Sequence, residues 1–129
     1  MTEEKEAITP DEEFLGRVTI DDEVIASIAQ NITLDQSGVA QMFSGLTDKV
    51  LGKWTAVKGV KIEHDEEGKL HITLSLSVYY GHRIPDVASE VQCAVRDGIE
   101  EMIDIPVGKV DVHVQSLVFN QENNIEGEK

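Results

Sequence analysis

A regular alternation of apolar and polar residues is the clearest pattern in this chain. It runs from Val60 to Tyr80 and is interrupted around "DEEG" at residues 65–68. A period of two predicts strands that bury one face and expose the other. The longer stretch has apolar residues at Leu70, Ile72, Leu74, Leu76, Val78 and Tyr80.

The segment "DEEG" predicts the turn of a β-hairpin. A three-residue loop with Gly68 in the left-handed conformation fits this sequence. We expect the loop to pair Ile62 with Leu70, which also sets Glu63 opposite Lys69 as a favourable charged pair. A slip of one residue would place Leu70 opposite Glu63 and lose both contacts.

Two segments have the apolar spacing of amphipathic helices. In residues 21–32, Asp21 or Asp22 is expected to accept a hydrogen bond from the first free amides. In residues 84–105, Pro85 suits the first turn and Pro106 prevents continuation. Cys93 should face solvent. The first stripe contains Val24, Ile25, Ile28, Ala29 and Ile32; the second contains Ile84, Val87, Ala88, Val91, Val95, Gly98, Ile99 and Met102.

Three further strands are predicted. Residues 16–21 place Val18 and Ile20 on one face, and residues 38–46 form a strand with a break at Gly45. Residues 109–119 alternate until Ser116, where Leu117 and Phe119 change the phase. A bulge or the end of the strand would explain that change.

The predicted order is β-α-β-β-β-α-β, which is typical of an α+β protein. The simplest burial is a two-layer sandwich, with both helices packed on one face of a mostly antiparallel sheet. We expect one domain at residues 14–119, flanked by disordered acidic tails at 1–13 and 120–129. The opposite sheet face would be open, carrying His71, Thr73, Ser75, Ser77, Tyr79 and His113.

The charge of the chain excludes some classes of ligand. The net charge is −14, of which the two tails carry −5 and −2. An acidic body repels phosphate groups, so direct binding to nucleic acid or to anionic lipid is not expected. No apolar run approaches the ~18 residues of a spanning helix, and the acidic N-terminus is unlike a signal peptide. With a single cysteine, these features predict a cytoplasmic protein without direct membrane insertion.

The chain offers few patterns typical of catalysis or metal binding. His71 and His113 could share the open face and bind a metal with Asp111 or Glu63, but they could equally be two solvated histidines. The sequence has no GxSxG and no glycine-rich phosphate loop. Acidic neighbours would raise the pKa of the Cys93 thiol and keep it inert. We therefore expect no catalytic residues, no metal site and no cofactor.

The stretch "YYGHRIP" is the remaining candidate for a binding site. Gly81 and Pro85 have geometric roles between a strand and a helix. Arg83, together with nearby helix amides, could hold an anion or the carboxylate of a partner, although the segment could also be a simple connection. The candidate partner contacts are His71, Tyr79, His82, Arg83 and His113.

Several segments, which follow one another in the family's order, resemble the alkaline shock protein / Gls24-like family of envelope stress proteins in Gram-positive bacteria. They cover nearly all of residues 16–119: "GRVTIDDEVIASIA", "SGVAQM", "GVKIE", "VYYGHRIPDVASEVQCAVRDGIEEM" and "VGKVDVHVQSLVF". One departure is that Met102 is followed by Ile103 and Asp104, where the family usually has Thr-Gly. The turn into the last strand is therefore expected to differ.

The resemblance implies a protein that acts without catalysis. The first hypothesis is a cytoplasmic scaffold or adaptor in envelope homeostasis and alkaline or general stress. It would self-associate and contact a membrane-anchored protein partner, which could hold it at the inner face of the membrane. The alternative is a regulator of fatty-acid synthesis that binds an acetyl-CoA carboxylase subunit. An RNA-binding module is a more remote alternative, which the charge opposes.

Overall fold

The fold is a helical layer on one face of a small sheet. The computed structural model describes residues 15–43 and 57–119, so the predicted tails and the break at Gly45 lie outside the described residues. The elements, in chain order, are α2 (Asp22–Leu34), β2 (Val39–Met42), β3 (Val60–His64), β4 (Leu70–Tyr79), α4 (Ile84–Ile103) and β5 (Val107–Val118). This confirms the α+β class and the predicted order from the first helix onward.

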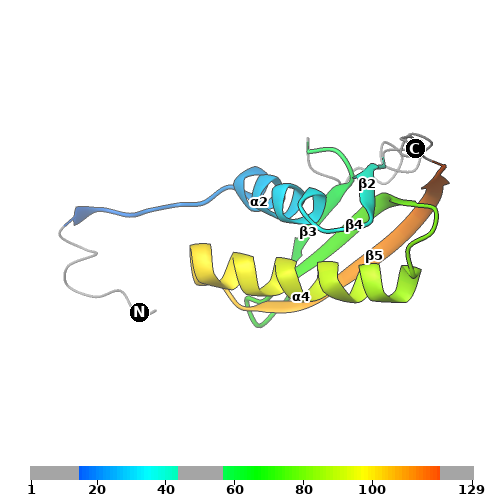
Figure 1. Ribbon diagram of the computed structural model, residues 1–129. Coiled ribbons are helices and arrows are strands. Elements are labelled where there is room, and N and C mark those ends of the chain that lie inside the picture. Colours follow the sequence, from blue (N-terminus) through cyan, green and yellow to red (C-terminus); the bar gives the residue numbers. More distant parts are fainter. Residues whose placement is uncertain (1–14, 44–56, 120–129) are drawn as a thin grey trace.

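Both helices lie against the same face of the sheet, as Figure 1 shows. The core forms between them because the apolar stripe of each helix meets the apolar positions of β4. Gly98 allows close packing of the helices, since a Cβ there would clash with Ile32 Cδ1. The predicted stripe of α4 is buried along its middle, but Ile84 and Met102 at its two ends are 36% and 66% exposed.

Strand β4 is the centre of the sheet. Strand β5 pairs with one edge of β4 in parallel, while β3 and β2 both pair with the other edge in antiparallel orientation. β3 and β2 meet at Ser75, which donates its N–H to Gly59 O (2.9 Å) and accepts from Phe43 N (2.8 Å). The two short strands β3 and β2 therefore pair, one after the other, with the same edge of β4.

The expected antiparallel pairings are present, but the longest pairing, between β4 and β5, is parallel. The reason for the parallel pairing is the connection between β4 and β5, which contains α4. A parallel neighbour requires a crossover, and α4 supplies one. Its 20 residues span about 30 Å, close to the length of the ten-residue β4. The chain therefore returns to the start of β4 before β5 begins.

The hairpin has the predicted loop but not the predicted register. Gly68 has a φ of 84°, and Asp65 N donates to Lys69 O across a three-residue loop. This loop pairs Ile62 with Ile72 and Glu63 with His71, so the expected pairs Ile62–Leu70 and Glu63–Lys69 are wrong. The observed register still keeps all apolar positions on the helical face, because it differs from the predicted one by two residues.

Residues 16–20 do not form the strand expected there. They are not paired with any described strand, and Val18 is 88% exposed. In Figure 1 this segment leads away from the body of the molecule. Ile20, at its end, packs against the core. An alternating sequence favours an extended chain, but it becomes a strand only where a sheet edge is within reach.

The sheet face opposite the helices, called the open face below, is less open than expected. Ser75 and Ser77 are 3% and 0% exposed. Their side chains are short and lie between longer neighbours. Ser77 Oγ is 2.7 Å from Ser116 Oγ, and Gln115 Nε2 is 3.5 Å from Ser75 Oγ. The polar side chains at this part of the face therefore bond to one another.

The predicted irregularity in the last strand is confirmed. The register of β5 against β4 shifts between the pairs Leu76–Val114 and Ser77–Ser116, which leaves Gln115 as the extra residue. This bulge brings Leu117 opposite Val78. The apolar side of β5 thus changes from even to odd positions without leaving the helical face.

Candidate partner-contact surface

The carboxyl ends of β4 and β5 meet at one end of the molecule. Because the two strands are parallel, the residues that follow them lie side by side. Tyr80 N donates to Val118 O at 2.9 Å, which extends the ladder by one step. The rings of Tyr80 and Phe119 stack there, with centroids 4.9 Å apart and planes inclined by 24°. Two residues that are 39 positions apart thus form one aromatic surface.

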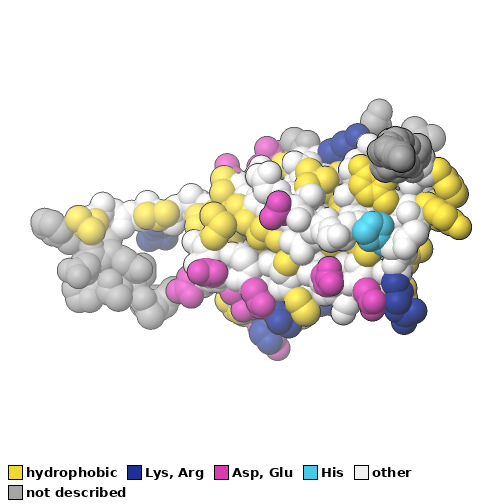
Figure 2. Space-filling view, in the orientation of Figure 1, with side chains coloured by type: hydrophobic (Ala, Val, Ile, Leu, Met, Phe, Trp, Pro, Cys, Tyr) yellow, Lys and Arg dark blue, Asp and Glu magenta, His cyan; other side chains and the backbone are white. Residues whose placement is uncertain are grey.

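This aromatic pair is strongly exposed. Tyr80 and Phe119 are 66% and 67% exposed, whereas Val78, one step earlier on the same side of β4, is fully buried. Leu117 and Ile84 at the same end are 40% and 36% exposed. Figure 2 shows hydrophobic side chains at the surface where β5 ends. We call Tyr80, Ile84, Leu117 and Phe119 the corner patch. Its apolar groups extend beyond the helical layer that would cover them.

A charged pair flanks the corner patch at the start of α4. Arg83 is the N-cap residue and makes no side-chain cap bond. Its Nε lies 3.4 Å from Asp86 Oδ2, with both side chains about two-thirds or more exposed. Asp86 also occupies the first turn, where a negative charge complements the helix dipole. Asp86 of the same chain therefore competes with any external carboxylate for Arg83, although a surface pair of this kind is weak.

His82 lies against the loop that precedes β2. A Cβ on Gly38 would lie 3.0 Å from His82 Nδ1 and 2.8 Å from Val87 Cγ2. Gly38 has a φ of 93°, and its carbonyl accepts from Tyr79 N at 2.9 Å. The backbone under the corner patch is thus closely packed, although the patch itself is apolar and exposed.

The five predicted contact residues do not form one site. Tyr79, His82 and Arg83 lie near the corner patch. His71 starts the open face at the hairpin end of β4, and His113 lies opposite Ser75, four residues along β4 from His71. That separation is about 13 Å along a strand, so the two histidines cannot share a metal ion. Within residues 15–43 and 57–119, no three His, Cys, Asp or Glu side chains are placed to hold one.

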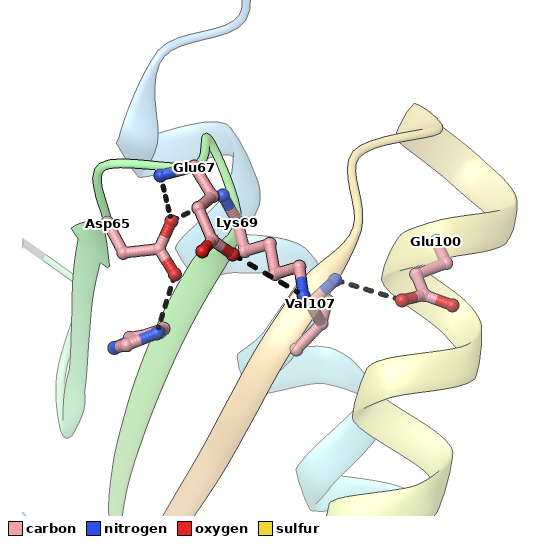
Figure 3. A network of polar contacts seen from close by, with 6 residues as sticks. Asp65, Glu67, Lys69, Glu100 and Val107 are labelled. Carbon is pink, nitrogen blue, oxygen red and sulfur yellow. Dashed lines mark hydrogen bonds and ion pairs between the residues drawn. The ribbon is translucent and has the colours of Figure 1, made fainter.

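The opposite end of the sheet is a polar network, drawn in Figure 3. We call residues 65–71, with Glu100 and Val107, the hairpin end. Asp65 Oδ1 accepts from the amides of Glu67 (2.8 Å) and Lys69 (2.9 Å), and Asp65 Oδ2 is 3.1 Å from His71 Nε2. Hydrogen bonds to the backbone, chiefly to Lys69, lower the pKa of Asp65 below its ordinary value of 3.8.

The same end closes the turn from α4 into β5. Glu100 Oε2 accepts from Val107 N at 2.9 Å. Asp104 ends the helix with a φ of 61° and is the only non-glycine residue with a positive φ in the described chain. This is the position where the resembled family usually has glycine. The expected difference in the turn is therefore a difference in side chain, since the backbone adopts the conformation that glycine favours.

None of the four residues of the corner patch was among the contacts predicted from the sequence, and the two aromatic ones carry most of its exposed area. The alternation places Tyr80 on the buried face of β4, and Phe119 marks only the change of phase in the last strand. A usable signal was present, because both residues lie one position beyond the ends of their strands. A large apolar residue at such a position extends past the core and has no helix to cover it. Cys93 is exposed, as expected.

Comparison with known proteins identifies a family to which residues 10–119 are similar. A family model described as the alkaline shock protein 23 family, with a cell envelope-related function, matches residues 10–119. The uncharacterized protein YloU of Bacillus subtilis (strain 168) is 32% identical over 108 residues, which cover 79% of this chain and 88% of YloU. The uncharacterized protein YqhY of the same strain is 31% identical over 109 residues, covering 82% of this chain and 80% of YqhY.

A third relative has lower identity and similar coverage. The uncharacterized protein Spy1535 of Streptococcus pyogenes serotype M6 is 24% identical over 106 residues, covering 82% of each chain. No solved structure matches. In the described residues, neither helix is long and apolar enough to cross a membrane.

Proposed function

The chain belongs to the alkaline shock protein 23 family, which has a cell envelope-related function, and from this premise we propose that it is a non-catalytic adaptor that binds a protein partner through the corner patch. The observation that carries the proposal is the stacked pair of Tyr80 and Phe119, two-thirds exposed at the surface. Exposed aromatic groups grouped at one site are typical of protein interfaces, where they supply most of the binding energy.

The net charge of the chain favours a protein partner over nucleic acid or anionic lipid. The chain carries −14, which opposes nucleic acid and anionic lipid. The strands of the open face offer one aromatic side chain besides histidine, Tyr79, whereas RNA-binding sheets stack bases on several. We propose that the adaptor works in the cytoplasm, at the inner face of the membrane, where a membrane-anchored protein holds it during envelope stress.

The test is affinity purification from the native cell with the membranes solubilised. Wild-type protein is compared with the double variant Tyr80→Ser/Phe119→Ser. Met102→Ser is the matched control, because Met102 has the same 66% exposure as Tyr80 but lies at the other end of α4. We expect a partner that wild type and M102S both recover and that the double variant loses. Equal recovery by all three proteins would contradict the proposal.

The identity of the partner separates the two functional hypotheses. A membrane-anchored protein among the recovered partners supports the scaffold at the envelope. An acetyl-CoA carboxylase subunit supports the regulator of fatty-acid synthesis. Both hypotheses use the same apolar surface. The double variant therefore tests whether the corner patch binds a partner, and identification of the recovered proteins by mass spectrometry distinguishes the two hypotheses.

A further inference from the structure

Among the described residues, one segment has the sequence of a strand but is not part of the sheet, and β5 has an outer edge with which no described strand pairs. We call residues 16–19 the arm. They lie outside the helices and strands of the described chain, and Val18 is 88% exposed. The arm leads away from the body in Figure 1, and Figure 2 shows hydrophobic side chains along it. We propose that the arm of one copy pairs with the outer edge of β5 in a second copy.

The outer edge of β5 can accept a strand. Ser75 directs its N–H and C=O toward β3 and β2, so the even-numbered residues of β4 direct theirs toward β5. In a parallel ladder, the residues paired with these even positions direct their own backbone groups away from β4. These residues are Val110, Val112 and Val114. The carbonyl of Val110 already accepts from Gln92 Nε2 at 3.0 Å. The backbone groups of Val112 and Val114, which lie before the bulge at Gln115, therefore form the edge that a strand can use.

The side chains on that edge also have room for a neighbour. Val112 and Val114 pack against the core but are only partly buried. In contrast, Val60 and Ile62 on the competing outer strand β3 are 0% and 6% exposed. Val60 N is also already bonded to Val57 O at 3.3 Å. An added apolar side chain therefore gains more buried area beside β5 than beside β3.

The arm matches this edge in length and in pattern. Its four residues equal the length of β2, which pairs with β4 in the same sheet. Val18 would extend the apolar side of the sheet next to Val112. Arg17 and Thr19 would then lie on the open face, where Arg17 can approach Asp111. An opposite charge beside Asp111 stabilises such a pair and helps to select the register.

A chain cannot make this contact with its own β5. Asp22, at the start of α2, lies against β3, since its Oδ1 is 2.8 Å from His64 Nε2. β3 and β5 lie on opposite edges of β4, so the position beyond β5 is three strand spacings, or about 14 Å, from β3. Ile20 packs against its own core. Thr19, the nearest residue of the arm, is three residues from Asp22, and three extended residues span at most about 11 Å, which is less than this distance. The edge must come from another copy.

The experiment uses one variant that breaks the arm and one that breaks the edge. Val18→Pro removes a strand amide from a residue that is 88% exposed, so the fold should remain intact. Val112→Pro removes an N–H that points away from β4, and an edge strand tolerates proline at such a position. Full-length wild type and both variants are compared by sedimentation velocity over a range of concentrations, at about 0.15 M salt to screen repulsion between acidic copies.

We expect wild type to associate with rising concentration and each variant to remain monomeric. The decisive sample is the mixture of V18P and V112P, which contains one intact arm and one intact edge. It should form a heterodimer of twice the chain mass and nothing larger, a result that mere destabilisation cannot produce. A monomeric wild type, an associating V18P or a monomeric mixture would overturn the proposal. None of these outcomes depends on the corner patch, so adaptor function and self-pairing can fail separately.

Discussion

The two ends of β4 show opposite solutions to the same problem. At the hairpin end, polar contacts within the chain close the strand termini, through Asp65 and Glu100. At the corner patch, the strands end in Tyr80 and Phe119, which contact each other and remain two-thirds exposed. At the hairpin end, the polar groups of the strand termini are hydrogen-bonded within the chain and need no partner. Exposed apolar surface, in contrast, is stabilised when a partner covers it. This contrast is the basis for our proposal that the corner patch, rather than the hairpin end, binds a partner.

Beneath their surfaces, the two ends also differ in packing. Gly38 lies under the corner patch and Gly68 in the hairpin turn, and both have a positive φ. A Cβ on Gly38 would meet Val87 at 2.8 Å and His82 at 3.0 Å, whereas a Cβ on Gly68 would have nothing within 4 Å. The patch is therefore held by a close-packed backbone, and the hairpin turn is not.

The largest effect is expected from Gly38→Ala, with Gly68→Ala as its matched control. We expect Gly38→Ala to lower the free energy of unfolding by about 3 kcal/mol, because backbone strain and overpacking add. Gly68→Ala should cost about 1 kcal/mol, from backbone strain alone. Chemical denaturation of both variants measures the difference. Equal losses would show that the two ends are packed alike.

A smaller effect, which depends on pH, is expected from Asp65→Asn. Folding lowers the pKa of Asp65 below 3.8, so its charged form stabilises the native state above that pH, and the stabilisation is lost as the pH falls through the lowered pKa. The variant should be less stable than wild type at pH 5, and the gap should narrow toward pH 2, in urea denaturation at each pH.

The control for this experiment is Glu67→Gln in the same loop. It removes the same charge, but within the described residues the Glu67 carboxylate makes just an ion pair with Lys69 at 3.7 Å, and its side chain is 76% exposed. We expect little change in stability at any pH, as is usual for surface pairs. If E67Q reproduced the pH dependence of D65N, loop charge rather than the bonds of Asp65 would be responsible.

The smallest effect is a gain in stability from Asp104→Gly. Asp104 ends α4 with a φ of 61°, a conformation that glycine adopts without strain. We expect the substitution to raise the free energy of unfolding by about 0.5–1 kcal/mol, visible as a higher melting temperature. A loss of stability would mean that the Asp104 side chain contributes a contact that outweighs the backbone strain.

Much of the fold could be predicted from local patterns. The alternation of β4, the stripes of the two helices and the bulge in β5 follow from the spacing of apolar residues, and Gly68 marks the turn. The hairpin register could not be settled in this way, because registers that differ by two residues bury the same faces. The burial of Ser75 and Ser77 was also missed, since it depends on which side chains lie on the neighbouring strands.

The candidate site was predicted only in part. Tyr79, His82 and Arg83 were located near the correct corner, but His71 and His113 lie elsewhere on β4 and β5. Tyr80 and Phe119 were missed because their contact depends on β4 and β5 being parallel. In an antiparallel pair, the residue after one strand lies beside the residue before the other, and these two rings would be a strand length apart.

The sequence by itself determined the two helices, four of the five predicted strands, their order and the face that each one buries, because those properties follow from periodicities within a few residues. The tertiary structure decided which strands are neighbours, in what direction and register, and which segment is left unpaired. These outcomes depend on contacts between residues far apart in the chain, such as the 39 positions between Tyr80 and Phe119. Only at that level did the corner patch, the arm and the outer edge of β5 become visible.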